Sequence, residues 1–159
     1  MKQSRFQIVT PTGALVVSMT GHTITGIDLR TRPLKNLPPA RNENEKRIAA
    51  ELKAYFSHAN TPLRWPLQIE GSDYQQRIWQ ALREIPAGSV KTYGQLAAEV
   101  GGSPRSVGNA CRQNPVPIYI PCHRVVARNG LGGFAGKTAG PRLELKRWLL
   151  QHEGARLPA

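Results

Sequence analysis

The sequence has 159 residues, enough for one domain or for two small halves that share an interface, and enough to bury a core. Its 22 Lys and Arg outnumber 10 Asp and Glu, and the net charge of +12 favours a polyanionic partner, with nucleic acid ahead of a membrane surface. Two cysteines exclude a disulfide framework, no signal region opens the chain and no apolar run could span a bilayer, so we expect a cytoplasmic, nucleoid-associated protein.

The first part of the chain predicts a small antiparallel sheet. Three short apolar runs are each bounded by Gly, Pro or a polar break, and hairpin turns separate them. The runs are residues 6–9, 14–19 and 23–29. The prolines that follow, Pro33, Pro38 and Pro39, predict a loop that crosses back over the sheet.

A helix is expected next, capped by Asn44 and running to about His58. Its apolar residues recur at helical spacing, while Glu45, Lys46 and Lys53 are expected on the solvent face. Residues 62–67 are apolar but twice interrupted by proline, which is typical of a linker or an edge segment.

We place a boundary near residues 66–71. It separates an N-terminal sheet-plus-helix subdomain, residues 1–66, from a C-terminal domain, residues 72–159. The predicted fold class is therefore α+β, with a small antiparallel sheet and a helix followed by a mostly helical domain.

The second half carries three helix-start signals. Ser72 with Gln75, and Thr92 with Gln95, have the spacing of capping boxes. A serine at the cap followed by a proline at the first helical position starts another helix, at Ser103, running to about Gln113. A last helix is expected from Pro141 to about His152, with Gly154 as its stop.

The two short helices joined at residues 101–102 form a helix-turn-helix pattern, similar to a winged helix. The second helix carries Arg105 and Arg112, and its small residues would allow close approach to a minor groove. Short helix pairs also occur in proteins that never meet DNA, but the net charge favours DNA here.

The stretch from residue 118 to 126 holds the candidate nucleophile. Cys122 lies between apolar runs, followed by His123, and a thiol beside a histidine in a basic chain suits attack on an anionic molecule. Neighbours in an extended strand point to opposite sides, so His123 serves Cys122 only if the backbone bends or a water relays the proton. Glu153 is a candidate to orient that histidine, with a solvated helix end as the plain alternative.

Metal and disulfide chemistry are disfavoured. The two cysteines and four histidines show no Cys-x-x-Cys or His-x-x-x-His spacing, so no metal site is expected. A bridge between Cys111 and Cys122 is conceivable but unexpected in a reducing compartment.

The chain resembles the alkylguanine-DNA alkyltransferases, also called methylated-DNA–protein-cysteine methyltransferases. Their signature Pro-Cys-His-Arg-Val stands at residues 121–125. Further blocks follow the family's order, at residues 85–88, 92–97, 105–108, 114–115 and 148–154. The resemblance covers nearly everything from Tyr74 onward, whereas the first half resembles the family only in layout.

The resemblance implies DNA repair by one irreversible transfer of an alkyl group from guanine O6 to Cys122, without a cofactor. O4-alkylthymine as a second substrate stays open. In this family the guanine flips out of duplex DNA, bound from the minor groove by a monomer; cooperative binding also stays open. His123 would be the water-relayed base, Glu153 its carboxylate partner, Asn114 the residue that fixes the turn, and Tyr93 the donor to the departing guanine.

The resemblance also places the DNA contacts and the substrate pocket. Arg105 matches the arginine that fills the vacated base stack. The further expected DNA contacts are Ser103, Ser106, Arg112 and Arg128, and the pocket residues are Val125, Phe134 and Ala135. The pocket loop departs from the family at residues 134–142, where it lacks the usual hydroxyls and is longer.

Three functions remain to be separated. The first is suicidal alkyl transfer. The second is lesion recognition without repair, although in the alkyltransferase-like proteins that do so a tryptophan replaces the cysteine. The third is a Cys-His hydrolase that turns over and ignores DNA.

Overall fold

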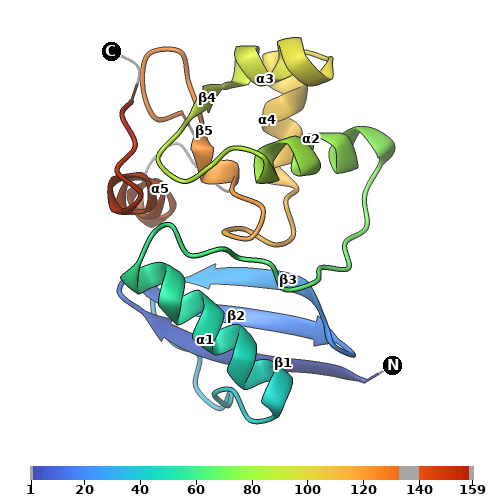
Figure 1. The fold of residues 1–159 in the computed structure, drawn as a ribbon, viewed down its shortest axis with the longest axis vertical. Coiled ribbons are helices and arrows are strands. Elements are labelled where there is room, and N and C mark those ends of the chain that lie inside the picture. Colours follow the sequence, from blue (N-terminus) through green and yellow to red (C-terminus); the bar gives the residue numbers. More distant parts are fainter. Residues whose placement is uncertain (1, 133–139, 158–159) are drawn as a thin grey trace. The chain divides into compact units, whose positions relative to one another are not determined.

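The computed structural model describes residues 2–132 and 140–157. Contacts divide the chain into two units (Figure 1). Unit 1 comprises residues 1–69 together with 115–119, and unit 2 comprises residues 70–114 and 120–159. The mixture of a small antiparallel sheet and helices confirms the predicted α+β class. The extents of the two predicted domains stay predictions, and residues 115–119 group with unit 1 although they fall inside the predicted range 72–159.

Unit 1 contains the predicted antiparallel sheet, with strands β1 (Gln3–Thr10), β2 (Gly13–Thr20) and β3 (Thr23–Arg30) in the order β1-β2-β3. The central strand β2 is apolar over most of its length and is buried along it, whereas the two outer strands alternate. The first hairpin requires glycine at position 13, where φ is +135° and a Cβ would collide with the Arg30 carbonyl.

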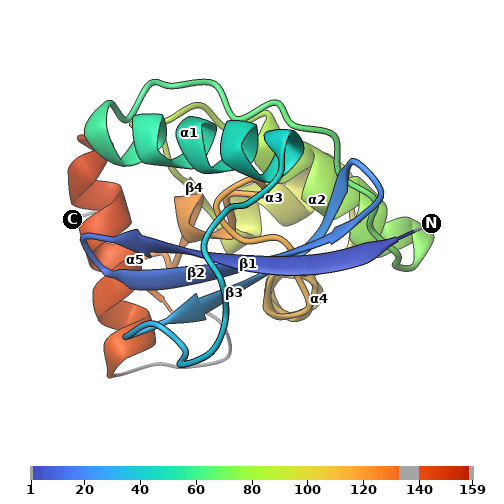
Figure 2. The same cartoon turned by 90° about the horizontal axis from the view of Figure 1, so that it is seen from below.

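Helix α1 (Glu43–Ser57) lies along one face of this sheet (Figures 1 and 2). The predicted cap was wrong by two residues, because Asn42 rather than Asn44 accepts from the Glu45 backbone N–H. Glu45 completes a capping box by accepting from the Asn42 and Arg41 N–H groups, and this draws it inward. It is buried rather than solvent-facing as predicted, since a carboxylate engaged with orphan N–H groups can leave water.

Two segments add to the sheet of unit 1. The stretch before the boundary pairs with β3 through a bridge of Ile24 to Leu67, as expected for an edge segment. Residues 115–119 approach β3 through a hydrogen bond from the Ile27 N–H to the Pro115 carbonyl, at 3.0 Å. Tyr119 also donates to Glu51 at 2.7 Å. This segment leads directly into the stretch that holds Cys122.

Unit 2 contains helices α2 (Asp73–Arg83), α3 (Tyr93–Val100), α4 (Pro104–Arg112) and α5 (Pro141–His152). The capping boxes predicted at Ser72 and Thr92 are both present, and Ser103 caps α4 with proline at its first position. Helix α5 ends in a Schellman arrangement, in which the Gly154 N–H donates to Gln151 and the Ala155 N–H to Leu150. That ending fixes Glu153 at the C-cap of the helix.

A two-residue parallel ladder joins distant parts of unit 2. Strand β4 (Lys91–Thr92) pairs with β5 (Val125–Val126), so that Thr92 lies opposite Val126. Because Tyr93 follows β4 and Cys122 comes shortly before β5, this ladder brings the phenol toward the thiol. Among the residues that the structure describes, no helix has the length and apolar character needed to cross a membrane.

Candidate active site

Cys122 lies in a single 3-10 turn, η1 (Cys122–Arg124), so the backbone bends here, which is one of the two alternatives left open by the sequence. The turn is closed by a hydrogen bond from the Arg124 N–H to the Pro121 carbonyl, at 3.0 Å. The bend removes the objection that neighbouring side chains must face opposite ways. Burial raises the pKa of the Cys122 thiol, while a hydrogen bond with Asn114 and the charge of Lys146 oppose that rise.

Asn114 fixes the approach to this turn. Its side-chain N–H donates to the Ile120 carbonyl at 2.8 Å, and its backbone N–H closes the end of α4 on Cys111. Between these anchors Ile118 has φ of +78°, an uncommon conformation for a β-branched residue. The surrounding hydrogen bonds therefore hold the chain in a conformation that Ile118 would not adopt by itself.

His123 and Glu153 form the predicted pair. The histidine Nε2 and the Glu153 Oε2 are 2.9 Å apart, and both side chains are buried. Because an ionised carboxylate only accepts, the Nε2 atom carries the proton. The histidine Nδ1 atom is then the basic one, and it is buried without a hydrogen-bond partner among the described residues. The structure thus places Glu153 behind His123 rather than in solvent.

Arg124 is a third member of this cluster that the sequence analysis did not identify. Its Nε and Nη2 atoms donate to the two Glu153 oxygens at 2.9 Å and 2.8 Å, and Nη1 donates to the Ile85 carbonyl at 2.6 Å. The signal for it was its place in the signature beside His123, which drew attention to the histidine alone.

Burial and neighbouring charges have opposite effects on the pKa values of Glu153 and His123. Burial raises the pKa of the Glu153 carboxyl, but hydrogen bonds from His123 and Arg124 outweigh burial and hold that pKa well below its usual range. Burial lowers the pKa of His123, and the attraction of Glu153 offsets this only in part. Glu153 is therefore ionised and His123 neutral around neutral pH.

Lys146, from α5, is a fully buried cation next to the nucleophile. Its Nζ donates to the Val125 carbonyl at 2.7 Å and lies 5.9 Å from the centre of the Tyr93 ring. Burial lowers the pKa of Lys146 to about 8, and the Coulombic influence of Cys122 and Cys111 counteracts this. Lys146 was not among the predicted site residues, although it falls in line with the buried Leu149 and Leu150 at helical spacing.

Tyr93 is the last side chain in this cluster. Burial raises the pKa of its phenol, and the nearby Cys111 and Cys122 thiols add to the rise. The phenol therefore stays protonated and can donate a hydrogen bond at any physiological pH. Burial likewise raises the pKa of Cys111, and both cysteines are free thiols.

The helix-turn-helix forms as predicted, from α3, a two-glycine turn and α4. Tyr74 of α2 fastens the turn, because its hydroxyl donates to the Gly101 carbonyl at 2.9 Å and lies 2.8 Å from the Ser106 hydroxyl. Ser106 in turn accepts from the Ser103 N–H at 2.9 Å. Both serines predicted to touch DNA thus also stabilise the start of α4.

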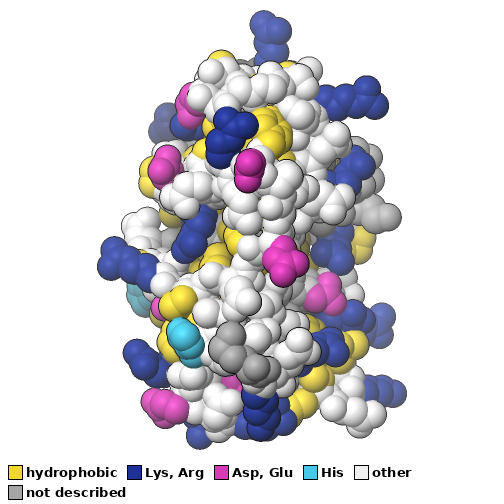
Figure 3. Space-filling view, turned by 90° about the vertical axis from the view of Figure 1, so that its right-hand side faces the viewer, with side chains coloured by type: hydrophobic (Ala, Val, Ile, Leu, Met, Phe, Trp, Pro, Cys, Tyr) yellow, Lys and Arg dark blue, Asp and Glu magenta, His cyan; other side chains and the backbone are white. Residues whose placement is uncertain are grey.

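The arginines predicted to meet DNA are exposed. Arg105 and Arg112 lie on α4, near its start and at its end, and Arg128 lies in the loop after β5. Lys and Arg side chains are also spread over the face of the molecule seen in Figure 3. Of the predicted pocket residues, Val125 is buried beside Lys146, whereas Phe134 and Ala135 lie outside the described residues.

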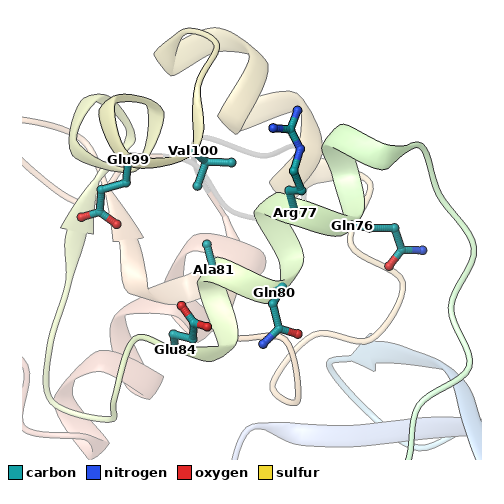
Figure 4. Close-up of a pocket in the computed structure, with 7 residues that line it drawn as sticks. All are labelled: Gln76, Arg77, Gln80, Ala81, Glu84, Glu99 and Val100. Carbon is teal, nitrogen blue, oxygen red and sulfur yellow. The ribbon is translucent and has the colours of Figure 1, made fainter.

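An open groove of about 620 Å³ is separate from this cluster (Figure 4). It runs between α2 and α3, and most of its lining residues are of polar or charged type: Gln76, Arg77, Gln80, Ala81, Glu84, Glu99 and Val100. None of these side chains belongs to the cluster around Cys122. Within the described part of the chain, no group of His, Cys, Asp and Glu could hold a metal ion.

Comparisons with known proteins agree with this geometry. Residues 73–155 match the family described as "6-O-methylguanine DNA methyltransferase, DNA binding domain". The Haemophilus influenzae methylated-DNA–protein-cysteine methyltransferase is 37% identical over 151 residues, covering 90% of this chain and 82% of that protein. The Salmonella typhimurium protein of the same name is 52% identical over 87 residues, 53% of this chain. That match spans about half the length of the Salmonella protein, at 48%.

A crystal structure of Mycobacterium tuberculosis OGT in complex with DNA has the same fold, with a TM-score of 0.79 and 31% identity over 98% of this chain and 96% of that one. Similarity therefore extends through both units and not only through the region around Cys122. The chain belongs to the 6-O-methylguanine DNA methyltransferase family.

Proposed function

We propose that this protein repairs DNA by transferring an alkyl group, irreversibly and once per molecule, from O6 of guanine in a duplex to Cys122. The observation that carries the proposal is the thiol in a bent turn, followed by a neutral His123 whose Nε2 is held by Glu153. Family membership supports the same activity. O4-alkylthymine is a further candidate substrate of the same chemistry.

The chemistry follows from the protonation states. The His123 Nδ1 atom takes the thiol proton, directly or through one water, and the thiolate attacks the alkyl carbon. The S–C bond forms as the bond from carbon to O6 breaks, so the electron pair moves onto the guanine. The Tyr93 phenol, held protonated by burial, donates a hydrogen bond to the leaving base. In the net reaction, the thiol loses one proton to His123 and the guanine anion takes up one proton, so that neutral guanine and a thioether remain.

Irreversibility follows from the products. A thioether is a poor alkyl donor and the neutral guanine a poor nucleophile, so no step regenerates the thiol. Unlike a Cys-His hydrolase, the protein is expected to reach a plateau at one equivalent. Unlike a lesion recogniser, it carries an intact cysteine at position 122.

DNA is expected to bind through α4, from the minor groove, with one protein molecule per lesion. Support comes from the exposed Arg105 and Arg112 on a helix with small side chains and from the DNA complex of the M. tuberculosis relative. Arg105 would fill the space of the flipped base, and Ser103, Ser106 and Arg128 would contact phosphates. This activity would place the protein in the cytoplasm, at the nucleoid.

The decisive experiment mixes the protein with a duplex that carries O6-methylguanine labelled in the methyl group. Peptide mass spectrometry should find one label per molecule on Cys122, and none after Cys122→Ser, although that variant still binds the duplex. Cys111→Ser is the matched control, because it removes the other thiol and should still accept the label. Binding without transfer by the wild type would favour the recogniser, and repeated turnover would favour the hydrolase.

The base-flipping role of Arg105 has its own test. Arg105→Ala should slow transfer from the duplex by about tenfold or more, since the unpaired site loses the group that fills it. Its attack on the free base O6-alkylguanine should stay close to wild type. Arg112→Ala provides the comparison, since loss of a phosphate contact weakens binding to all duplexes alike. Equal losses on duplex and free base in the Arg105 variant would refute the role.

A further inference from the structure

Arg124 grips the carboxylate of Glu153 by a bidentate contact, with one hydrogen bond to each oxygen. Its Nε atom donates to Oε1 at 2.9 Å and its Nη2 atom to Oε2 at 2.8 Å, while the arginine side chain is only 11% exposed. A third hydrogen bond, from Nη1 to the Ile85 carbonyl at 2.6 Å, ties the guanidinium to the segment that follows α2. A lysine could not reproduce this, because its single ammonium cannot fork across two oxygens.

This bidentate contact determines the charge state of the carboxylate that His123 hydrogen-bonds. The Glu153 Oε2 atom is shared by Arg124 and by the His123 Nε2 atom, so three N–H groups converge on two oxygens of a side chain with no exposed area. A proton on this carboxyl would face a donor on either oxygen, so the group stays ionised. An ionised acceptor requires the proton of the imidazole on Nε2, and Nδ1 is left as the base.

The charges around His123 also disfavour its protonation. The groups that face His123 are Glu153 and Lys146 from α5 and Arg124 from its own turn, with the Cys122 thiol next to it in sequence. The single negative charge is thus already engaged by a guanidinium, and Lys146 adds a second positive one. An imidazolium at position 123 would be opposed by two cations and stabilised by only one, shared, anion.

We propose that Arg124 is a positioning residue for alkyl transfer: by gripping both Glu153 oxygens it keeps His123 neutral and holds its Nδ1 lone pair ready for the thiol proton. This rests on the proposed function, since the proton matters only if Cys122 is the nucleophile. Arg124 itself touches neither the thiol nor the DNA in this role. Removing it takes the guanidinium away from the Glu153 carboxylate, and the histidine then becomes easier to protonate.

The test measures single-turnover transfer at saturating duplex for Arg124→Gln, from about pH 6 to about pH 9. Loss of one contacting charge moves a pKa by roughly one unit or more. The acid limb of the pH–rate profile, where the rate falls as His123 is protonated, should therefore move to higher pH by at least about one unit. Transfer should be about tenfold slower at about pH 6 and return close to the wild-type rate at about pH 9. Arg147→Gln is the control, because it removes an exposed arginine paired at 3.8 Å with Glu144 on α5, and its profile should not move.

A second readout needs no DNA. In histidine labelled with nitrogen-15, the imidazole signals of free Arg124→Gln should show His123 titrating at higher pH than in the wild type. A merely structural arginine would lower the rate by the same factor at every pH and leave this titration in place, and either result would overturn the proposal. Wild-type protein that transfers no label at any pH would instead refute the proposed function, with the titration still deciding the role of Arg124.

If Arg124→Gln does not fold, Arg124→Lys decides the matter. It keeps the positive charge but cannot fork, so we expect the acid limb of the wild type with a plateau lowered by about threefold to tenfold, because the carboxylate is held less firmly. A plateau rate equal to that of the wild type would refute the role of the bidentate contact. An acid limb displaced to higher pH would refute the role of the positive charge.

Discussion

Lys146 carries a charge into the least polar part of the site. Its Nζ is buried and donates to the Val125 carbonyl, so its attraction for a thiolate at Cys122 is weakly screened by water. The same charge repels a proton on His123. Lys146 thus favours the thiolate and the neutral histidine at once, which is the combination that the transfer step uses.

We therefore expect Lys146→Met, of similar length without charge, to slow transfer by about tenfold near neutral pH, as one opposite charge commonly moves a pKa by at least one unit. The loss should shrink above about pH 8, where Lys146 of the wild type itself loses its charge. Rapid-quench measurements of label transfer between about pH 7 and about pH 10 would record it. A pH-independent loss would mean that Lys146 acts through packing alone.

The buried lysine also makes stability depend on pH. Its pKa is about 8 in the folded protein against 10.5 for the ordinary side chain, so between these values the unfolded chain binds more protons. Stability must then rise with pH across this window, because the cost of burying the charge disappears as the lysine deprotonates. Urea unfolding should find that the wild type gains about 1 kcal/mol relative to Lys146→Met between about pH 7 and about pH 9.

At the same scale, the sequence predicted the chemical pair but not its supports. Cys122, His123 and Glu153 were identifiable because a thiol beside an imidazole, with a carboxylate to orient that imidazole, has the residue types of nucleophilic catalysis. Arg124 and Lys146 were not, because a charged residue in a sequence is read as solvated unless a partner is known. Their burial depends on Glu153 and on the Val125 carbonyl, which lie far away along the chain.

At the scale of elements, the turn between α3 and α4 sets where Arg105 points. Gly101 and Gly102 have φ of +108° and +89°, a region that side chains rarely adopt. A Cβ on Gly102 would collide with the Tyr74 hydroxyl and the Ser106 hydroxyl, whereas one on Gly101 would meet nothing nearby. The two glycines thus share a backbone requirement and differ in their contacts.

This difference makes a matched pair of variants. Gly101→Ala should cost about 1 to 2 kcal/mol of folding free energy from its backbone alone. Gly102→Ala should cost about 1 kcal/mol more, because it must also displace the Tyr74 hydroxyl, and it should weaken duplex binding where Gly101→Ala changes it little. Thermal unfolding and fluorescence anisotropy would measure both. Equal effects would mean that Tyr74 does not hold the turn.

Elements with local signals were predicted well, and those that depend on distant pairing were not. Capping boxes at Ser72 and Thr92 are written in neighbouring residues, so the helix starts followed. The ladder of β4 and β5 has two residues in each strand and no periodicity of its own. The sequence left open whether the backbone bends at Cys122, because no local pattern marks the 3-10 turn that the structure has there.

For the whole molecule, the positive charge is not confined to the helix-turn-helix. Unit 1 has ten Lys and Arg against four Asp and Glu, and unit 2 has twelve against six, so each carries an equal excess. The net charge correctly predicted a polyanionic partner. It could not tell which unit carries the positive charge. The grouping of residues 115–119 with unit 1 was equally hidden, since it depends on pairing with β3.

Part of this excess lies on the exposed side of α1, at Lys46, Arg47 and Lys53. Because positive charge raises the rate at which DNA is met even without contact, changing all three to Gln should slow association with a lesion duplex by about threefold or more at low salt. Above about 0.3 M salt the difference should vanish, since charges more than a few ångströms apart are then screened. Transfer at saturating duplex should be unchanged.

Glu43→Gln, which removes an exposed acid from the same helix, should act in the opposite direction, and stopped-flow measurements with a fluorescent duplex would record both signs. An equal slowing at high salt would mean that these side chains touch DNA directly rather than attract it from a distance.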